Sequence, residues 1–534
     1  MKIKVYGFLA LIVIVAAAWK ICLMAINAFP FNSDEAVVAL MARHILAGET
    51  PTFFYGQAYM GSLDAFLVAA GFALFGQAVW VIRLVQTLLY IGTIIATVFI
   101  GRVAFGSIST GLLAGLFMAI PVVNTTLYTT VSLGGYGEAM FFGSFSLLIG
   151  FHILNFVQHH SQPNNKLIVL LFGWGLVSGI GAWANSLSLV FSVPVALMLV
   201  ILMVKQPAHK AGYWKRAWIG IIGLGVGSLP WWLYAIQNGF SKLLTELTGS
   251  AVAVEQGSWL VRIWDHFLNL IVLGFPAAFG LRPSWEVRWL ALPLIPFILA
   301  FWGIVGLFFY RSLRQRQAET AAFVVLGGII LTFCLGFLLT SFGVDPSGRY
   351  FLPLAVPFSL IGAQYVLMVV KNVKWQIGLA ALILAFNAWG TLESAFRNPP
   401  GITTQFDAIT VIDQTRMPDL IAFLKQTGET SGYSNYWVSY PLAFLSGEEL
   451  IYTPRLPYHS DLRYTPRDDR YAPYDLVVQS NPKEAFITTR NPALNDDLRK
   501  QFTQQGVTWF EKQIGDFQIF YNLSKKVEYV ENPG

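Results

Sequence analysis

The chain has 534 residues, of which 55% are hydrophobic and 12% are charged. So much apolar surface excludes a soluble globular protein of this length and indicates one that crosses a membrane many times. The net charge of +6 is unevenly spread, because residues 1–396 hold 21 Lys/Arg and 12 Asp/Glu whereas residues 397–534 hold 14 and 17. The sequence therefore predicts a transmembrane domain over 1–396 and a polar domain over 397–534. The basic charge reflects membrane topology and not nucleic-acid binding.

An acidic pair, Asp34-Glu35, follows the first apolar run, Val5 to Ala28. Because cytoplasmic segments are enriched in basic residues, Lys2 and Lys4 predict a cytoplasmic N-terminus and place the acidic pair on the outer face. Adjacent carboxylates at the boundary between water and lipid are costly, which indicates a function. The alternative is helix capping, since Asn32 precedes Glu35 by three residues, close to a capping box. We expect both acids to be catalytic candidates, with Asp34 the working carboxylate and Glu35 the support.

The first outer loop, residues 30–78, contains two short helical patterns. Glu35–Ala47 reads as an amphipathic helix ended by Gly48, and Ser62–Phe75 is too short to span the bilayer. Both suit the membrane interface, where they would cover a cavity. Aromatic and amide side chains here suit a sugar ring, although an ordinary aromatic belt is an equal alternative. The candidate binding residues are Tyr55, Gln57, Tyr59 and Asp64.

Apolar runs long enough to span recur through the rest of the transmembrane domain. They cover residues 79–101, 108–123, 138–157, 167–183, 186–204, 216–236, 288–310, 320–342, 349–370 and 375–395. The connections alternate in the sign of their charge, which supports this topology and places the tail outside the membrane. The parity of the crossings requires the stretch 261–281 to stay out of the membrane or to cross as one of a pair. The sequence thus predicts 11 to 13 crossings.

Polar residues on the outer side mark two further candidate positions. The segment Gly134–Glu138 places Tyr136 and Glu138 at the entry to a membrane helix, where an acid rarely lacks a function. The alternative is a favourable interaction of a first-turn acid with the helix dipole. Outer arginines are disfavoured by topology, and their planar fork suits phosphate oxygens, although contact with lipid headgroups is the alternative. The candidates are Arg83, Arg282 and Arg349, the last followed by Tyr350.

Cofactor motifs are absent from the sequence. The seven histidines and two cysteines show no metal-ligand spacing, and there is no glycine-rich phosphate loop. We expect no required cofactor and leave a divalent metal open.

The tail, residues 397–534, mixes helical and strand patterns. Asp419–Gln426 and Pro492–Gln505 predict helices, and Tyr474–Gln479 predicts a buried strand. Phe517–Tyr521, preceded by Trp509–Phe510, is strand-like. We therefore expect a small α/β domain outside the membrane, attached to a mainly α polytopic bundle.

The order of these features resembles the GT-C class of membrane glycosyltransferases. Within that class it looks like the family 39 group, which includes protein O-mannosyltransferases, aminoarabinose transferases and bacterial relatives. The matching segments are Asn32–Glu35, Leu74–Gly76 with Arg83, Gly134–Glu138 and Gly348–Pro353. In the tail, Tyr433–Gly447 is similar to a segment of the bacterial relatives.

The resemblance implies a hexosyl or pentosyl transferase that inverts the anomeric centre. Its donor would be a polyprenyl-phosphate sugar, and its acceptor a lipid, glycan or protein hydroxyl at the outer face of the plasma (inner) membrane. Asp34 matches the family's acidic residue, and Arg349 or another outer arginine would stabilise the departing phosphate. The segment Tyr55–Met60 departs from the Lys-Pro-Pro-like stretch of aminoarabinose transferases, which leaves the sugar and the acceptor open.

Two other classes of function compete with this reading. A transporter or flippase of lipid-linked sugars would also need many crossings and intramembrane polar residues. No obvious internal repeat is present, and the acids gather on one face, which disfavours transport. A non-catalytic scaffold with a partner-binding tail is the third alternative.

Overall fold

A computed structural model describes residues 2–160, 162–205, 207–248, 258–315, 320–397, 401–405, 409–527 and 529–530. The chain divides into two compact units, which we call the bundle unit and the tail unit. The bundle unit comprises Met1–Ile26, Tyr59–Asp64 and Arg83–Arg397, and the tail unit comprises Asn27–Ala58, Ala65–Ile82 and Asn398–Gly534. Most of the loop 30–78 therefore folds with the end of the chain. The domain limits expected from composition, 1–396 and 397–534, stay a prediction.

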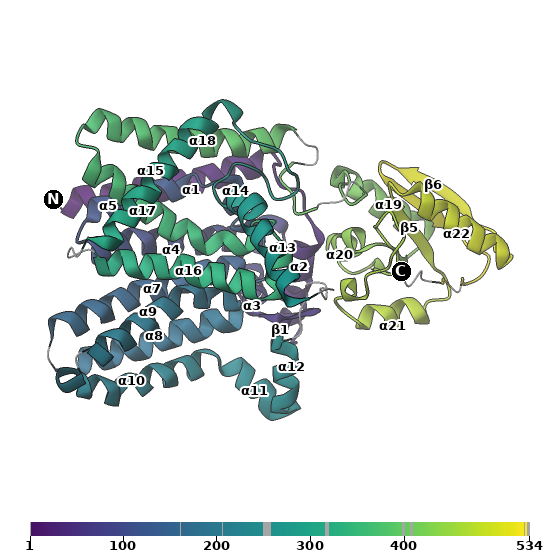
Figure 1. Ribbon diagram of the computed structural model, residues 1–534. Helices are drawn as coiled ribbons and strands as arrows, with labels where there is room; N and C mark the ends of the chain where they lie inside the picture. Colours follow the sequence, from purple (N-terminus) through teal and green to yellow (C-terminus); the bar gives the residue numbers. More distant parts are fainter. Residues whose placement is uncertain are drawn as a thin grey trace. The chain divides into compact units, whose positions relative to one another are not determined.

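Helices form most of the bundle unit, from single turns to helices of membrane-spanning length (Figure 1). They are α1 (Lys2–Ala25), α4 (Val79–Phe105), α5 (Ile108–Ala119), α6 (Val123–Tyr128), α7 (Tyr136–His159), α8 (Asn165–Ala184), α9 (Leu189–Lys205), α10 (Pro207–Gly227), α11 (Leu229–Asn238), α12 (Phe240–Thr248), α13 (Trp259–Leu268), α14 (Phe275–Ala278), α15 (Ile295–Arg314), α16 (Thr320–Leu339), α17 (Ala355–Val369) and α18 (Val373–Arg397). Helix α8 packs against both α7 and α10, and the three lie side by side in Figure 1.

Small residues allow α8 and α10 to approach closely. A side chain at Gly175 or Gly179 of α8 would meet the backbone of α10, and one at Gly223 or Gly227 of α10 would meet the backbone of α8. Close backbone approach through glycines is a standard means of helix association inside a membrane, where no hydrophobic effect drives it. The glycines in these apolar runs therefore specify the helix pair.

The protein is a multi-pass membrane protein, and the candidate spans among its described residues reach the lower end of the 11 to 13 crossings that the sequence predicts. Ten helices within the described ranges are long and apolar enough to cross, or eleven if the pair Gly212–Gly227 and Leu229–Asn238, bent by 65°, is one span. The run 108–123 was expected to span, yet it forms only the 12 residues of α5. Pro121 lacks an amide hydrogen and disfavours a helical conformation in the residue before it, so the helix ends early. Conversely, Trp259–Ala278 is long enough to span by itself.

Two helices follow α1, as the sequence predicted. They are α2 (Ser33–Leu46) and α3 (Leu63–Phe75), and a hairpin of β1 (Phe53–Phe54) and β2 (Gln57–Gly61) lies between them in the chain. The expected amphipathic character of α2 is wrong. Ten of its 14 residues are buried, because α2 packs within the tail unit against α20 (Tyr436–Leu445).

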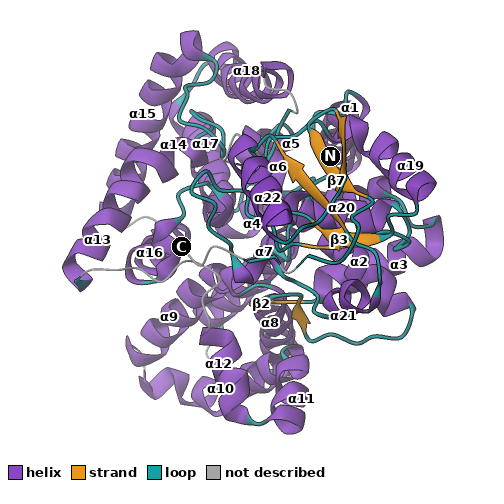
Figure 2. Ribbon diagram, turned by 90° about the vertical axis from the view of Figure 1, so that its right-hand side faces the viewer, coloured by secondary structure: helices purple, strands orange, loops and turns teal. Residues whose placement is uncertain are grey.

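A five-stranded sheet organises the remainder of the tail unit (Figure 2). Its order is β4 (Ile451–Thr453), β3 (Ser431–Tyr433), β5 (Ala485–Thr489), β7 (Phe517–Tyr521) and β6 (Phe510–Ile514). The pairs of β3 with β4 and β5 are parallel, and those of β7 with β5 and β6 are antiparallel.

Successive side chains of the strands point to alternate faces of the sheet, and a hydrophobic core lies on each face. Ile487 of β5 and Ile519 of β7 face one layer, formed by α19 (Met417–Thr427) and α20. Their neighbours Phe486 and Phe520 face the opposite layer, formed by α22 (Pro492–Gln504). Because successive side chains of a strand point to opposite faces, each strand serves both layers.

The predicted elements of the tail are confirmed with one exception. The two predicted helices form α19 and α22, and the predicted strand 517–521 forms β7. The strand predicted over Tyr474–Gln479 is wrong, because this segment is part of the helix α21 (Pro473–Ser480). Pro473 at the first helical position and Asp475 in the first turn are helix-start signals, and they outweigh the β-branched pair Val477-Val478. The fold class, a mainly α membrane bundle with a small C-terminal α/β region, is confirmed.

Candidate functional site

Asp34 lies in the first turn of α2, where its side chain is partly exposed. Asn32 caps the helix, since its Oδ1 accepts a hydrogen bond from the Glu35 amide at 3.0 Å. The carboxylate of Asp34 accepts a hydrogen bond from the hydroxyl of Tyr436, with 2.5 Å between Oη and Oδ1. A second contact runs the other way, from Ser33 Oγ to the Tyr436 carbonyl at 2.5 Å. The start of α2 is thus fastened to the start of α20.

Glu35 has a different environment from its neighbour. Its side chain is completely buried, while its amide serves the cap. The two acids therefore face different surroundings, and the one that is open to solvent is Asp34. The catalytic role expected of Glu35 stays a prediction, and its burial agrees with the supporting role.

Tyr55 and Gln57, also in the tail unit, contact the end of the chain. The ring of Tyr55 stacks on Tyr471 with 4.9 Å between centroids, and its hydroxyl donates to Glu49 Oε2 at 2.6 Å. With the Gln57 amide turned so that its oxygen faces the guanidinium of Arg470, Oε1 accepts from both Nη atoms, at 2.7 and 2.9 Å. Both candidates are therefore held by residues of the tail that the sequence did not single out.

Asp64 and Glu138 form a buried acidic pair in the bundle unit. Gln86 Nε2 donates to Asp64 Oδ1 at 2.9 Å and to Glu138 Oε1 at 3.5 Å. Ser132 Oγ and the amide of Gly135 donate to the other oxygen of Asp64. Burial raises the pKa of Asp64, and these donors oppose that rise. The pair connects α3, α4 and α7 and acts as a brace at the entry to α7.

The turn before α7 requires its glycines. Gly134 and Gly135 both have left-handed backbone conformations, with φ of 86° and 80°. Such values are strained for residues with a side chain, and Gly135 directly precedes the first turn of α7. The turn delivers Tyr136 and Glu138 into the bundle, as their sequence segment indicated.

Arg349 follows a second glycine turn of the bundle unit. Gly348 has φ of 107°, and the guanidinium of Arg349 pairs with Asp345 at 2.5 Å. The same guanidinium lies over the ring of Tyr350, 4.9 Å from its centroid. The ring of Tyr136 lies 6.4 Å from that of Tyr350. Three predicted residues are therefore brought together here, and the Arg349 side chain remains 32% exposed.

A cavity of about 180 Å³ opens beside this cluster. Tyr59, Asn185 and Tyr350 supply polar groups to its lining, and the apolar part includes Leu187, Val190, Phe333, Phe337 and Phe342. Within the described chain, the buried Nδ2 of Asn185 and Nε of Arg349 have no hydrogen-bond partner. Unpaired buried donors are costly and mark places where a ligand with acceptor oxygens would bind.

The other two predicted arginines have different surroundings. Arg282 donates to the carbonyls of Leu273, Pro283, Glu286 and Pro346, so its guanidinium is taken up by backbone. Arg83 is 7% exposed on α4. Their assignment to substrate stays a prediction, and Arg282 serves as a brace between loops.

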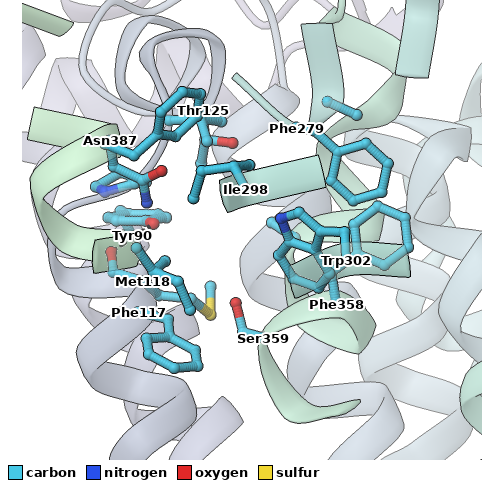
Figure 3. A pocket seen from close by; sticks show the side chains of 16 residues that line it. Tyr90, Phe117, Met118, Thr125, Phe279, Ile298, Trp302, Phe358, Ser359 and Asn387 are labelled. Atoms are coloured by element: carbon cyan, nitrogen blue, oxygen red, sulfur yellow. Dashed lines mark hydrogen bonds between the residues drawn. The ribbon is translucent and has the colours of Figure 1, made fainter. Parts of the chain in front are cut away.

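A second, smaller cavity of about 60 Å³ lies within the bundle unit (Figure 3). Its labelled aromatic residues include Tyr90, Phe279, Trp302 and Phe358, and they surround a common hollow. Two of the polar groups in its lining are already paired, since Tyr90 Oη donates to the Met118 carbonyl and Asn387 Nδ2 to the Ile120 carbonyl. This cavity suits an apolar chain, and it contains no residue predicted for the site.

Sequence reasoning did not single out Tyr436, which donates to Asp34, or Arg470, which lies over the ring of Tyr436. Tyr436 stood in a tail segment noted for its resemblance to bacterial relatives, which was the available signal. The charged stretch around Arg470 carried none. In the part of the chain that the structure describes, no group of three or more His, Cys, Asp or Glu side chains is placed to hold a metal ion.

Comparisons with known proteins establish the fold. No protein-family profile matches the chain, and no curated protein matches it in sequence. Among solved structures, ArnT from Cupriavidus metallidurans bound to undecaprenyl phosphate matches with a TM-score of 0.59 at 12% identity, over 97% of this chain and 98% of ArnT.

An oligosaccharyltransferase from Archaeoglobus fulgidus matches in two further structures. One, a complex with zinc and sulfate, has a TM-score of 0.51 at 11% identity, over 96% of this chain and 73% of that one. The other holds an inhibitory peptide and a dolichol-phosphate, with a TM-score of 0.50 at 12% identity, over 91% and 69%. The chain therefore has the fold of the GT-C class of membrane glycosyltransferases, as its sequence indicated.

Proposed function

We propose that this protein transfers a sugar from a polyprenyl-phosphate donor to an acceptor hydroxyl at the outer face of the membrane. The observation that carries the proposal is the Arg349–Tyr350 cluster beside a cavity whose lining includes two unpaired buried polar groups, Nδ2 of Asn185 and the hydroxyl of Tyr350. The fold supports it, because ArnT, which shares the fold over nearly its full length, was solved with undecaprenyl phosphate. The neighbours named above are transferases, which favours transfer over the transport alternative.

The donor would bind in the bundle unit. Arg349 would exchange part of its pairing with Asp345 for the phosphate oxygens, to which a guanidinium can donate two parallel hydrogen bonds. The apolar wall of the cavity, with Val190 and Phe333 among its residues, suits isoprene units. As the sugar leaves, negative charge grows on the phosphate, and a fixed cation stabilises that charge.

The acceptor would bind at Asp34. An acceptor hydroxyl would donate to the carboxylate, which orients it and takes up its proton as attack proceeds. The bond from the acceptor oxygen to the anomeric carbon forms while the bond from that carbon to the phosphate oxygen breaks. Attack opposite the leaving phosphate inverts the anomeric centre, and the sugar would be a hexose or a pentose. A lipid phosphate is already a good leaving group, so we propose that no metal is required.

We further propose the topology indicated by the basic connections. The N-terminus would be cytoplasmic, and the tail would be outside the plasma membrane. The partners would then be a lipid-linked sugar, a lipid, glycan or protein acceptor and the bilayer itself.

Transfer assays test the proposal. Purified protein in lipid nanodiscs would be given a panel of polyprenyl-phosphate sugars, and products would be identified by mass spectrometry. We expect Asp34→Asn to lower the turnover by about 10²–10⁴-fold, the range for a general base, because the amide cannot take up a proton. Asp419→Asn, which alters an exposed acid of the tail unit, is the control and should keep its turnover. Transfer from no donor would contradict the proposed reaction, and full turnover of Asp34→Asn would contradict the role of Asp34.

A further inference from the structure

We infer that Tyr436 and Arg470, two residues from the C-terminal part of the chain, position Asp34 for the transfer step. The inference rests on the proposed function, and it assigns the tail a direct part in the reaction. All three residues belong to the tail unit, so the argument uses contacts within one compact body.

Tyr436 is a fixed hydrogen-bond donor to Asp34. Asn435 caps α20 through the Trp437 amide at 3.0 Å, and its Nδ2 donates to Thr489 Oγ1 at 2.8 Å, which ties the start of α20 to β5. Ser33 holds the Tyr436 carbonyl from the side of α2. The phenol is 3% exposed and directs its hydroxyl at Asp34 Oδ1. Backbone and side chain are both constrained, so the carboxylate cannot rotate without losing this bond.

The neutral form of Tyr436 is strongly favoured, which keeps its hydroxyl a hydrogen-bond donor. Burial raises its pKa well above the ordinary value, and the negative charge of Asp34 raises it further. The phenol therefore stays protonated at physiological pH and donates to the carboxylate. Because the bond engages Oδ1, the second oxygen of Asp34 is left to receive an acceptor hydroxyl.

Arg470 supplies a buried positive charge to the same place. Its side chain is 8% exposed, and its Cζ lies 5.4 Å from the centroid of the Tyr436 ring. Burial opposes its charge, but Tyr436, Asp34 and Asp468 outweigh burial and raise its pKa. The guanidinium also donates to the Gly56 carbonyl at 3.0 Å. Arg470 therefore links the charge of Asp34 to the loop that precedes α3.

A second carboxyl group, that of Asp468, also interacts with the charge of Arg470. Asp468 is 6% exposed, and burial raises its pKa to about 6, against the opposing charge of Arg470. Arg470 is thus shared between two carboxylates, of which one is partly protonated near neutral pH. Tyr436 and Arg470 together fix the surroundings of Asp34, and an acceptor-orienting carboxylate needs such a fixed direction.

The test compares two buried tyrosines of the tail unit. Tyr436→Phe removes the donor to Asp34, whereas Tyr452→Phe removes a hydroxyl that donates to the Glu429 carbonyl at 2.8 Å, in the core. We expect Tyr436→Phe to lower kcat by about 10- to 100-fold, the effect of a misplaced reacting group, with KM for the donor unchanged within about twofold. Tyr452→Phe should keep kcat. The double variant Asp34→Asn with Tyr436→Phe should be no slower than Asp34→Asn, because residues that act as a unit are not additive.

A second pair of variants keeps the test decisive if Tyr436→Phe folds poorly. Arg470→Lys retains the positive charge, and we expect it to lose less kcat than Arg470→Gln. Equal losses in the two would overturn the electrostatic role of Arg470. Wild-type kcat in Tyr436→Phe, or a full additional loss on top of Asp34→Asn, would overturn the positioning role of Tyr436. Both results leave the proposed function standing, which only an active Asp34→Asn or the absence of transfer would contradict.

Discussion

At the scale of single residues, the acidic pair shows how far sequence reasoning reaches. Adjacent positions on a helix point about 100° apart, so a pattern of cap and acids predicted different surroundings for Asp34 and Glu35. Their burial agrees with that split. The partners of Asp34 could not be predicted, because Tyr436 is separated from it by 402 positions. Nothing in local periodicity reports a contact over that distance.

Arg349 allows a test at the same scale. We expect Arg349→Lys to lower kcat/KM for the lipid-phosphate donor by about tenfold or more, because an ammonium cannot donate two parallel hydrogen bonds to phosphate oxygens. The loss of one charged hydrogen bond, about 1.5–3 kcal/mol, corresponds to that factor.

Arg288→Lys is the matched control, since Arg288 also pairs with an acid in the bundle unit, Glu286, at 3.1 Å. Steady-state kinetics with varied donor would distinguish the two. Equal effects of the two substitutions would show that Arg349 has no special relation to the donor.

At the scale of elements, the predictions succeeded or failed according to how helix-capping and helix-breaking residues were weighed. Glycine and capping residues located α2 and α3 within about two residues. The strand predicted at 474–479 was wrong because a short segment with an apolar stretch, Leu476–Val478, fits both strand and helix, and Pro473 was given too little weight. The span predicted over 108–123 was wrong for the same reason, because hydropathy takes no account of the amide hydrogen that Pro121 lacks, and α5 ends at Ala119.

The glycine turn before α7 makes a prediction at this scale. Gly135→Ala should lower the melting temperature of the bundle unit, because alanine is strained at φ of 80° and its Cβ would also meet the Ala184 carbonyl. Gly106→Ala is the control, since φ is 65° there and the space around it is open.

The strain alone costs about 1–2 kcal/mol. We expect Gly106→Ala to show that loss and Gly135→Ala to exceed it clearly. Thermal unfolding followed by intrinsic fluorescence in nanodiscs would measure both. Equal melting temperatures would show that the backbone near Ala184 can give way.

At the scale of the whole molecule, composition predicted a membrane bundle with a polar tail, and the fold confirms that class. It could not predict that residues 27–58 belong with residues 398–534 in one unit. The joining contacts include the packing of α2 on α20 and individual polar pairs, such as Glu448 with His44 and Arg43. Contacts between segments so far apart leave no periodic pattern in a sequence.

The pairs around Glu448 predict an acid-dependent stability of the tail unit. Burial by itself would raise the pKa of Glu448, but hydrogen bonds from His44, Tyr474 and Arg43 outweigh burial and lower this pKa to about 2. A carboxyl whose pKa is lower folded than unfolded stabilises the fold above its unfolded value, about 4.3. That stabilisation is lost as the pH falls from about 4 towards 2.

Glu448→Gln should therefore lower the melting temperature of the tail unit at pH 7, and the difference from wild type should shrink towards pH 2. Glu449→Gln, which alters the neighbouring exposed acid paired with Lys425, should show little effect at either pH. Melting curves between pH 2 and pH 7 test this. A difference that is the same at both ends would contradict the linkage.

The discontinuous tail unit also has a consequence for biosynthesis. Asp34 leaves the ribosome 402 residues before Tyr436, and at about 5–20 residues per second that interval lasts about 20 to 80 s. Throughout this time the carboxylate lacks the phenol and the guanidinium that hold it. The proposed acceptor site at Asp34 would thus be assembled only after Tyr436 and Arg470 have been synthesised and the tail unit has folded. Under the proposed function, a nascent chain that ends before Tyr436 would lack the residues that position Asp34.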